Sequence, residues 1–304
     1  MTRILVLRLS ALGDVIHTIP AVVALRPHAQ ISWVVEAPYR ELVELVAGVG
    51  AIPVRYKKWG KALYASRNDI GEALRKMKGA DASIDFQGLV KSAAVPLLAR
   101  IKTRYGFDRA AIREKPALLF TNRRIHVDTT THVIEQNLAL ARGAMPDARR
   151  GEAHWNAFPQ NSNLDAFANK VVLLPGAGKP NKLWPINRFR ELARRIGDDT
   201  LAVWGPGERE LAEAIGARVA PPTNLRELAW ILQHARVVIG GDTGPLHLAD
   251  ALGANVIGLY GPTNPRRNGP YTQLDRCIDR FSSTKLMDSI TVEEVMKILE
   301  RIGA

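Results

Sequence analysis

Short apolar runs of five or six residues alternate with segments of helical spacing along nearly the whole chain, and this alternation constrains the fold more than any other feature. Apolar strands separated by helices are typical of parallel sheets that are covered on both faces. The sequence therefore predicts a doubly wound α/β protein. We expect strands at residues 3–8, 31–36, 52–56, 83–87, 171–175, 200–205, 237–242 and 255–260.

Helical periodicity marks several of the segments between these strands. Apolar residues recur every three or four positions after Asp14, which predicts one continuous helix there. Near the end of the chain, Thr291 and Glu294 have the spacing of a capping box, which opens a final helix. We expect helices at residues 14–26, 131–142, 187–196, 208–215, 225–234, 245–252 and 291–302.

The alternation is interrupted once, in a segment that is rich in Asn and Ala and has no periodicity. We therefore expect a first domain over residues 1–150, a linker over 151–170 and a second domain over 171–304. Doubly wound sheets bind ligands outside the carboxyl ends of their strands. Two such domains would place a ligand-binding cleft between them.

The composition is that of a globular protein, with 46% hydrophobic and 24% charged residues. No run of about 18 uncharged apolar residues occurs, so we expect no transmembrane helix. The single cysteine, Cys277, excludes a disulfide within the chain and a cysteine-rich metal site. These features fit a cytoplasmic protein.

The net charge of +12 is concentrated in the first half of the chain. Residues 1–150 carry 24 Lys and Arg against 13 Asp and Glu, a balance of +11, whereas the remainder carries 18 against 17. This asymmetry predicts an anionic partner for the first domain. The charge alone leaves nucleic acid, anionic lipid and a small acidic substrate open.

Asp14 lies where the first expected strand leads into the first expected helix, directly after the small-residue turn 10–13. Small residues let a ligand approach the backbone, and the amides at a helix N-terminus are free to bind it. Asp14 therefore has two interpretations. It caps the helix, or it acts as a general base at the floor of the cleft.

In the second half, the segment 242–247 follows a strand that ends in two glycines. The backbone amides of Thr243 and Gly244 are placed to bind a phosphate group at the start of the next helix. His247 lies in the first turn of that helix. It is either part of this site or a buried structural histidine.

Two further loops follow strands of the second half. The loop 176–182 contains two glycines and two lysines, Lys179 and Lys182, which suit an anion but are also ordinary for a solvated loop. Glu208 follows another strand, where a carboxylate can accept hydrogen bonds from a ribose. An acidic residue that merely opens a helix is the alternative interpretation.

Several common motifs are missing. The chain has no Walker A loop, no GxGxxG after an expected strand, no Asp-x-Asp pair and no HExxH. We therefore expect no metal site and no cofactor, and we expect backbone amides and lysines to neutralise the phosphates of a ligand.

Taken together, these residues resemble glycosyltransferase family 9, the ADP-heptose:lipopolysaccharide heptosyltransferases, and most closely its heptosyltransferase I branch. The similarity is carried by six motifs in the family's order along the chain. They are the segments 10–20 (SALGDVIHTIP), 57–61 (KKWGK), 85–93 (DFQGLVKSA), 182–185 (KLWP), 242–247 (DTGPLH) and 260–265 (YGPTNP).

The resemblance implies a GT-B fold, in which two Rossmann-like domains face a cleft and the last helix, 291–302, packs back on the N-terminal domain. It implies an inverting, metal-independent glycosyltransferase that moves L-glycero-D-manno-heptose from ADP-heptose to a Kdo sugar of the lipopolysaccharide inner core. The partners would be the nucleotide sugar and Kdo-lipid A, with no nucleic acid. The enzyme would lie in the cytoplasm, peripherally on the inner membrane.

The resemblance also implies roles for individual residues. Asp14 would be the base for the acceptor hydroxyl, Lys182 would contact the donor phosphate, and Glu208 would contact the nucleoside. The other donor-side residues would be Gly13, Ala177, Gly178, Asp242, Thr243, Gly244 and His247. The acceptor-side residues would be Arg8, Lys57, Lys58, Lys61, Lys91, Arg113 and His132.

Two other classes of protein compete with this interpretation. Another GT-B enzyme, such as a different transferase or a UDP-sugar epimerase, would use the same second domain but prefer uridine. A nucleic-acid binder would explain the charge of the first half, but it needs aromatic residues for base stacking, and only 6% of the residues are aromatic.

Overall fold

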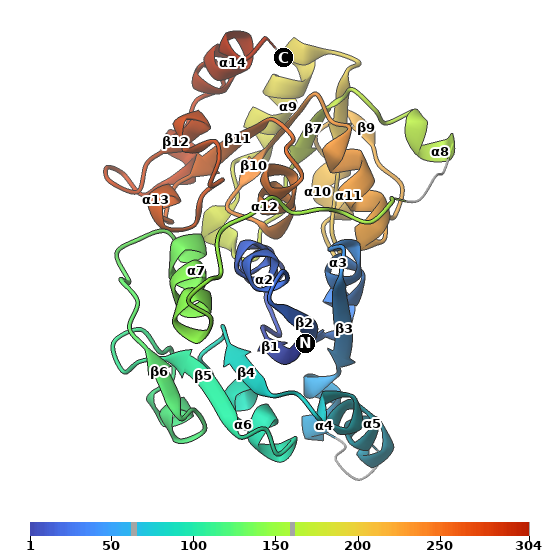
Figure 1. Ribbon diagram of the computed structural model, residues 1–304. Coiled ribbons are helices and arrows are strands. Elements are labelled where there is room, and N and C mark those ends of the chain that lie inside the picture. The colour runs from blue at the N-terminus through green and yellow to red at the C-terminus, as the bar shows by residue number, and fades with distance from the viewer. Residues whose placement is uncertain (62–65, 159–161, 304) are drawn as a thin grey trace. The chain divides into compact units, whose positions relative to one another are not determined.

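The computed structural model describes residues 1–61, 66–158 and 162–303, which form two compact units, Met1–Ala157 and Phe158–Ala304 (Figure 1). The division falls inside the segment that we expected to be a linker. Each unit is built on a sheet of six parallel strands, and each is described here by itself. The cleft expected between the two units stays a prediction.

The sheet of the first unit has the strand order β3-β2-β1-β4-β5-β6. Its strands are β1 (Thr2–Leu7), β2 (Ala29–Glu36), β3 (Val49–Val54), β4 (Ala82–Asp85), β5 (Thr103–Phe107) and β6 (Arg123–Ile125). Its helices are α1 (Leu12–Ile16), α2 (Ile19–Leu25), η1 (Ala37–Tyr39), α3 (Arg40–Leu45), α4 (Tyr56–Lys61), α5 (Arg67–Met77), α6 (Val90–Leu98), η2 (Lys115–Leu119) and α7 (Val133–Ala144).

The sheet of the second unit has the order β12-β11-β10-β7-β8-β9. Its strands are β7 (Val171–Leu174), β8 (Thr200–Ala202), β9 (Arg218–Val219), β10 (Val237–Gly241), β11 (Val256–Tyr260) and β12 (Cys277–Asp279). Its helices are α8 (Ser162–Asp165), η3 (Pro180–Lys182), α9 (Ile186–Ile196), α10 (Arg209–Glu213), α11 (Leu225–Gln233), α12 (Gly244–Ala251), α13 (Pro265–Asn268), η4 (Leu274–Arg276), η5 (Met287–Ser289) and α14 (Val292–Arg301).

Both sheets have the same topology when their strands are numbered within each unit. That topology is the Rossmann order 3-2-1-4-5-6, in which the chain reverses direction across the sheet between the first and fourth strands. The reversal lies between β1 and β4 in the first unit and between β7 and β10 in the second. The predicted doubly wound α/β fold is confirmed.

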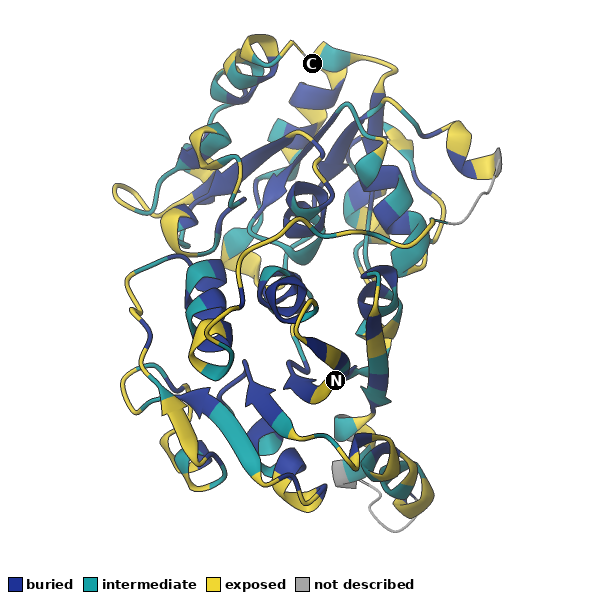
Figure 2. Ribbon diagram, in the orientation of Figure 1, coloured by how far each residue is buried: buried dark blue, intermediate teal, exposed yellow. Residues whose placement is uncertain are grey.

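Burial of the strands explains why the apolar runs form sheets. All residues of β7, β10 and β11 are buried, and Figure 2 shows buried residues along the strands of each sheet, with exposed residues on the helices that cover them. In the second unit, the rings of Trp184 and Phe189 meet edge to face at 4.8 Å inside the core. The core of each unit fixes the strand ends, and the strand ends position the loops.

The expected continuous helix after Asp14 is wrong, because the structure breaks it at His17 and Thr18 into α1 and α2. Pro20 is the reason. A proline has no N–H to donate to the carbonyl of residue 16, and its ring would clash with that carbonyl. It is instead accommodated in the first turn of α2, where no such bond is needed.

The last helix, α14, begins after Thr291, and the expected capping box with Glu294 is confirmed. Within the second unit α14 packs against α9 and β11, and Val292, Val295 and Leu299 join that unit's core. A contact of this helix with the first unit stays a prediction. No helix among the described residues has the length and apolar character to cross a membrane.

Candidate functional site

Several of the residues singled out in the sequence lie at the reversal point of each sheet. In the first unit, Arg8 and Asp14 follow β1, and Asp85 ends the neighbouring strand β4. In the second unit, Lys182 follows β7 and Asp242 follows the neighbouring strand β10. Carboxyl ends of strands at a reversal point leave a crevice that binds ligands in doubly wound sheets.

Asp14 is held between two arginines. Its Oδ1 atom lies 2.8 Å from Nη2 of Arg8 and 3.2 Å from Nη2 of Arg113, and Nη1 of Arg113 donates to Oδ2 at 3.3 Å. Arg8 is 1% exposed and also donates to the carbonyl of Phe86. Asp14 does not cap the helix, because Ala11 is the N-cap residue of α1 and no side chain caps it.

The two arginines set the charge state of Asp14. Burial alone would raise the pKa of its carboxyl group, but the charges of Arg8 and Arg113 outweigh this and lower the pKa below its usual value. Burial lowers the pKa of Arg8 to about 10, so its guanidinium stays protonated at neutral pH. Asp14 is therefore a carboxylate, and 27% of its side chain is exposed.

A buried aspartate supports this cluster from β4. Oδ1 of Asp85 accepts hydrogen bonds from the amides of Gln87 at 2.9 Å and Gly88 at 3.3 Å, and Oδ2 accepts one from the hydroxyl of Ser92 at 3.1 Å. The turn held in this way presents Oε1 of Gln87 to the amide of Leu9 at 2.7 Å. Asp85 thus orders the turn that binds the backbone of Leu9, the residue after Arg8.

The same turn positions Arg113. Gly88 has a φ of +67°, which favours glycine, and an added Cβ would lie 3.3 Å from the backbone nitrogen of Arg113. The carbonyl of Gly88 accepts from the amide of Glu114 at 3.0 Å. The close approach of these backbones explains how a residue 99 positions away in sequence reaches Asp14.

Asp85 is expected to make the stability of the protein depend on pH. Burial raises its pKa to about 6, so between roughly pH 4 and 6 the folded chain holds a proton there that the unfolded chain has lost. The contribution of Asp85 to stability must then fall as the pH rises through this window. Relative to Asp85→Asn, the wild-type free energy of unfolding should drop by about 2 kcal/mol between about pH 4.5 and 7.5. Denaturant titrations of both proteins measure this difference, and a difference that is independent of pH contradicts it.

Asp242 is the centre of the cluster in the second unit. Its Oδ2 atom lies 2.5 Å from Nζ of Lys182, and its Oδ1 atom lies 3.0 Å from Nε2 of His247 and 2.8 Å from Nδ2 of Asn268. Burial would raise the pKa of Asp242, but His247 and Lys182 outweigh it and lower the pKa strongly. The structure thus brings together three of the residues expected on the donor side.

The start of α12 lies beside this cluster. Thr243 is the N-cap residue, Gly244 begins the helix, and no side chain caps it. The hydroxyl of Thr243 is buried and has no hydrogen-bond partner in the structure. A buried hydroxyl without a partner costs stability unless a ligand binds it. The helix N-terminus and this hydroxyl together suit an anionic group such as phosphate.

Glu208 lies over two glycine turns that end neighbouring strands. It is the N-cap residue of α10, but its Oε2 atom accepts from the amide of Gly205 at 2.9 Å. A Cβ added at Gly176 would lie 2.0 Å from this carboxyl group, so a larger residue there would displace the end of the Glu208 side chain. In the loop after Gly176, Ala177 is half-buried, whereas Gly178 is exposed and has open space around it.

The residues expected on the acceptor side are more dispersed. His132 is buried as the N-cap residue of α7, where its Nδ1 atom accepts from the amide of Ile134, and its ring lies edge-on to His17 at 5.7 Å. Lys91 is half-buried near the start of α6, and Lys58 is exposed on α4. Gly13 lies within α1. The side chains of Lys57 and Lys61, also in α4, lie outside the described residues.

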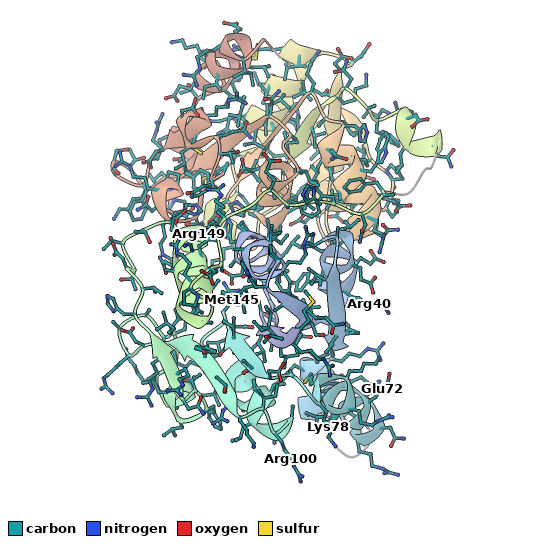
Figure 3. The ribbon with its side chains drawn as sticks, in the orientation of Figure 1. Arg40, Glu72, Lys78, Arg100, Met145 and Arg149 are labelled. Carbon is teal, nitrogen blue, oxygen red and sulfur yellow. The ribbon has the colours of Figure 1, made fainter. Side chains whose placement is uncertain are left out.

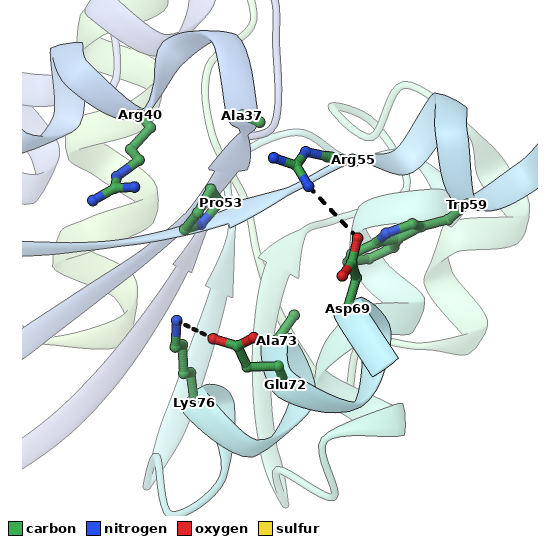
Figure 4. Close-up of a pocket in the computed structure, with 9 residues that line it drawn as sticks. All are labelled: Ala37, Arg40, Pro53, Arg55, Trp59, Asp69, Glu72, Ala73 and Lys76. Carbon is green, nitrogen blue, oxygen red and sulfur yellow. Dashed lines mark ion pairs between the residues drawn. The ribbon is translucent and has the colours of Figure 1, made fainter. Parts of the chain in front are cut away.

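A pocket of about 280 Å³ lies beside the basic segment 57–61 (Figure 4). Trp59 forms one wall, and its indole nitrogen is buried without a partner. Arg55 faces Asp69 at 3.6 Å, and Lys76 pairs with Glu72 at 2.7 Å, as the dashed lines in the figure mark. Because Arg55 and Lys76 are paired with carboxylates, they add little net positive charge to the pocket. Its lining instead offers an aromatic wall and polar groups.

Two functional positions escaped the analysis of the sequence. Asp85 stands in a motif that we recognised, but only the tertiary fold shows which backbone amides its carboxylate binds. Asn268 carries no sequence signal, because it lies outside every motif and reaches Asp242 only through the fold of α13. Among the described residues, no group of three or more His, Cys, Asp and Glu is placed to hold a metal ion.

Two Rossmann-ordered units, each with a charged cluster at its reversal point, define a ligand-binding α/β protein of two domains. A model of glycosyltransferase family 9 (heptosyltransferase) matches residues 67–295. The chain belongs to this family and is a glycosyltransferase. That result favours the transferase interpretation over the epimerase and over the nucleic-acid binder.

The similarity to individual proteins extends over the whole chain. Lipopolysaccharide heptosyltransferase 1 of Escherichia coli strain RS218 is 33% identical, covering 98% of this chain and 97% of its own length. The protein of that name from Pseudomonas aeruginosa PAO1 is 35% identical and covers 88% and 81%. The structure of E. coli heptosyltransferase WaaC with ADP has a TM-score of 0.85 at 27% identity, covering 99% of this chain and all of the other.

Proposed function

We propose that this enzyme transfers L-glycero-D-manno-heptose from ADP-heptose to a Kdo sugar of the lipopolysaccharide inner core. The observation that carries the proposal is the pair of clusters at the two reversal points, one around Asp14 and one around Asp242. Similarity to lipopolysaccharide heptosyltransferases along nearly the full chain supports the choice of substrates. The acceptor is part of a membrane lipid, so the enzyme acts peripherally at the cytoplasmic face of the inner membrane.

The cluster in the second unit is suited to the donor diphosphate. Lys182 supplies a cation, the N-terminus of α12 supplies free amides, and Thr243 supplies a hydroxyl that lacks a partner. The ammonium group of Lys182 is paired with Asp242. On binding, it turns toward the phosphates and stabilises the negative charge that grows on the leaving group. His247 and Asn268 then keep Asp242 in place.

Glu208 is suited to the nucleoside part of the donor. Its carboxylate lies at the carboxyl ends of β7 and β8, close to Gly176 and Gly205, where the lack of side chains leaves the backbone accessible. A carboxylate at such a turn accepts hydrogen bonds from ribose hydroxyls. Ala177 and Gly178 contribute backbone amides to the phosphates.

The cluster in the first unit is suited to the acceptor. Asp14 removes the proton of the attacking hydroxyl as the new bond forms, and the diphosphate leaves from the opposite face of the sugar, which inverts the anomeric carbon. With its low pKa, Asp14 is a weak base that is always ionised, so proton transfer occurs late, when the hydroxyl has become acidic. Arg113 pairs with Asp14 but is 43% exposed, so its guanidinium can also pair with the carboxylate of the acceptor sugar.

The decisive experiment combines the purified enzyme with ADP-heptose and a Kdo-bearing acceptor and identifies the product by mass spectrometry. We expect the acceptor mass to increase by one heptose, and calorimetry to show tighter binding of ADP than of UDP. Transfer from a UDP-sugar with no transfer from ADP-heptose would contradict the proposal and favour another sugar-nucleotide enzyme.

The reaction is expected to proceed without a divalent cation, because Lys182 and the α12 amides already supply positive charge for the diphosphate. Turnover should therefore be unchanged in excess EDTA. The control is a parallel assay with added magnesium. Loss of turnover in EDTA with recovery on adding magnesium would exclude the metal-independent mechanism.

The lysines of the segment 57–61 are expected to attract the anionic acceptor. The triple variant Lys57→Ala/Lys58→Ala/Lys61→Ala should raise the KM for the acceptor about tenfold, because exposed ion pairs contribute a few tenths to one kcal/mol each. ADP binding should not change. Lys78→Ala, an exposed lysine that ends α5 (Figure 3), is the matched control. An acceptor KM that responds neither to the triple substitution nor to salt would make these lysines ordinary surface charges.

A further inference from the structure

Three large apolar side chains are exposed on one part of the first unit. Leu97 and Leu98 at the end of α6 are 46% and 65% exposed, and Leu119 at the end of η2 is 81% exposed. They account for three of the five exposed leucines among the described residues. Large apolar side chains that gather on a surface mark a site of interaction more often than single ones do.

Hydrogen bonds show that these leucines lie at the same end of two neighbouring segments. The starts of α6 and η2 lie together at Glu114, whose Oε2 atom accepts from the amide of Val90 at 2.7 Å and which directly precedes η2. The residues that follow the two helices meet at Arg104, whose guanidinium donates to the carbonyls of Ile101 at 2.8 Å and Phe120.

The similar lengths of α6 and η2 are consistent with two helices that run side by side. The nine residues of α6 and the five of η2 rise roughly 13 Å and 10 Å, respectively. The leucines at their ends therefore form one apolar group.

The chain around this apolar group is rich in positive charge. Residues 90–124 contain nine Lys and Arg and only two Asp and Glu, a balance of +7. Arg100 and Lys102 follow the end of α6, and Nδ2 of Asn122 donates to the carbonyl of Lys102 at 2.7 Å, which brings the neighbouring Arg123 to the same place. All three cations are exposed, and among the described residues none of them has a carboxylate at ion-pairing distance. Arg100 points away from the ribbon in Figure 3.

We infer that Leu97, Leu98, Leu119, Arg100, Lys102 and Arg123, here called the leucine–arginine patch, dock the first unit on a membrane surface that contains anionic lipids. The leucines enter the boundary between headgroups and acyl chains, and the cations contact lipid phosphates. The charge of the patch and its apolar centre match such a surface, whereas a soluble anion would need no exposed leucines.

The place of the patch in the fold connects it to the site around Asp14. Arg113, which pairs with Asp14, lies one residue before Glu114, where both segments begin. The patch lies at the other end of these segments, roughly one length of η2 away. A lipid acceptor held in the membrane could then present its sugar headgroup to Asp14. This inference rests on the proposed function, because it assumes an acceptor that remains in the membrane.

Vesicle sedimentation tests the patch directly. The full-length protein is mixed with vesicles of phosphatidylcholine alone or of phosphatidylcholine with phosphatidylglycerol. We expect binding only to the anionic vesicles, with a decrease as salt is added. Arg100→Glu/Lys102→Glu/Arg123→Glu should weaken binding at least about 100-fold, because each cation near an anionic leaflet contributes about fivefold. Leu98→Ser/Leu119→Ser should weaken it at unchanged charge.

Matched substitutions on the second unit are the control. Leu286 is 56% exposed, and Arg194 and Lys297 are exposed cations. Leu286→Ser/Arg194→Glu/Lys297→Glu should leave vesicle binding unchanged. The inference is overturned if the patch variants and the control bind alike, if the wild type ignores anionic vesicles, or if it binds RNA through the patch in their place.

Turnover on two acceptors separates this inference from the proposed function. The patch variants should transfer heptose normally to a soluble, acyl-free Kdo acceptor and lose activity only on acceptor in vesicles. If the wild-type enzyme transfers heptose to neither acceptor but binds vesicles through the patch, the proposed function is contradicted and the docking surface is supported. Equal turnover of wild type and variants on vesicle-bound acceptor would contradict the docking surface alone.

Discussion

Asp14→Asn is expected to lower turnover by at least about 100-fold, the range that a positioned general base contributes. The amide has nearly the same size as the carboxylate but cannot take the proton of the attacking hydroxyl. The affinity for ADP should stay the same, because the residues that we propose for the donor belong to the second unit. Steady-state kinetics together with calorimetry of ADP binding measure both quantities.

The structure adds an expected loss of stability for this variant. Arg8 is buried, and removing the charge of Asp14 takes away its nearest counterion, which costs about 3 kcal/mol. Activity must therefore be measured per folded molecule. Asp108→Asn is a suitable control, because Asp108 lies in the same unit, is 25% exposed and pairs with His126 away from β1. Normal turnover of folded Asp14→Asn would leave this aspartate only a structural role as the counterion of Arg8.

Lys182→Ala is expected to have an effect of similar size by a different route. Removing one preorganised group that stabilises the charge of a transition state typically lowers kcat by about 100- to 1,000-fold. Lys182 is already paired with Asp242, so weakening of this ion pair would offset part of its attraction to the phosphates of the donor. We therefore expect kcat to fall more than the affinity for ADP-heptose.

Lys179 provides the control for this substitution. It lies in the same loop, is exposed, and precedes η3 by one residue. Lys179→Ala should keep more than half of the wild-type turnover. Asp242→Asn should resemble Lys182→Ala, because His247 and Lys182 lose the charge that holds them. If Lys182→Ala and Lys179→Ala have equally small effects on turnover, Lys182 has no special role and is an ordinary surface charge of the loop.

The amino-acid pattern predicted the fold because the central strands are buried on both faces. Continuous apolar runs such as those of β7 and β10 have no other stable place than the middle of a covered sheet. The strands that escaped prediction are β5, β6, β9 and β12, of which β6, β9 and β12 are edges, and β9 has only two residues. Strands at or near an edge bury less surface, so their sequences need less apolar character. The two arginines of β6 are exposed.

The sequence also determined where the candidate site lies, because small residues, glycines and charges follow the buried strands at fixed positions. It did not determine which charges meet. Arg113 reaches Asp14 across 99 residues, and Asp242 contacts Lys182 across 60, because sheet pairing and the turn at Gly88 bring distant loops together. Which residues follow a given strand can be read from the local sequence. Which side chains meet depends on which strands become neighbours in the sheet. Only the tertiary structure determines which strands are neighbours, because the strand order is selected by the burial of the whole sheet.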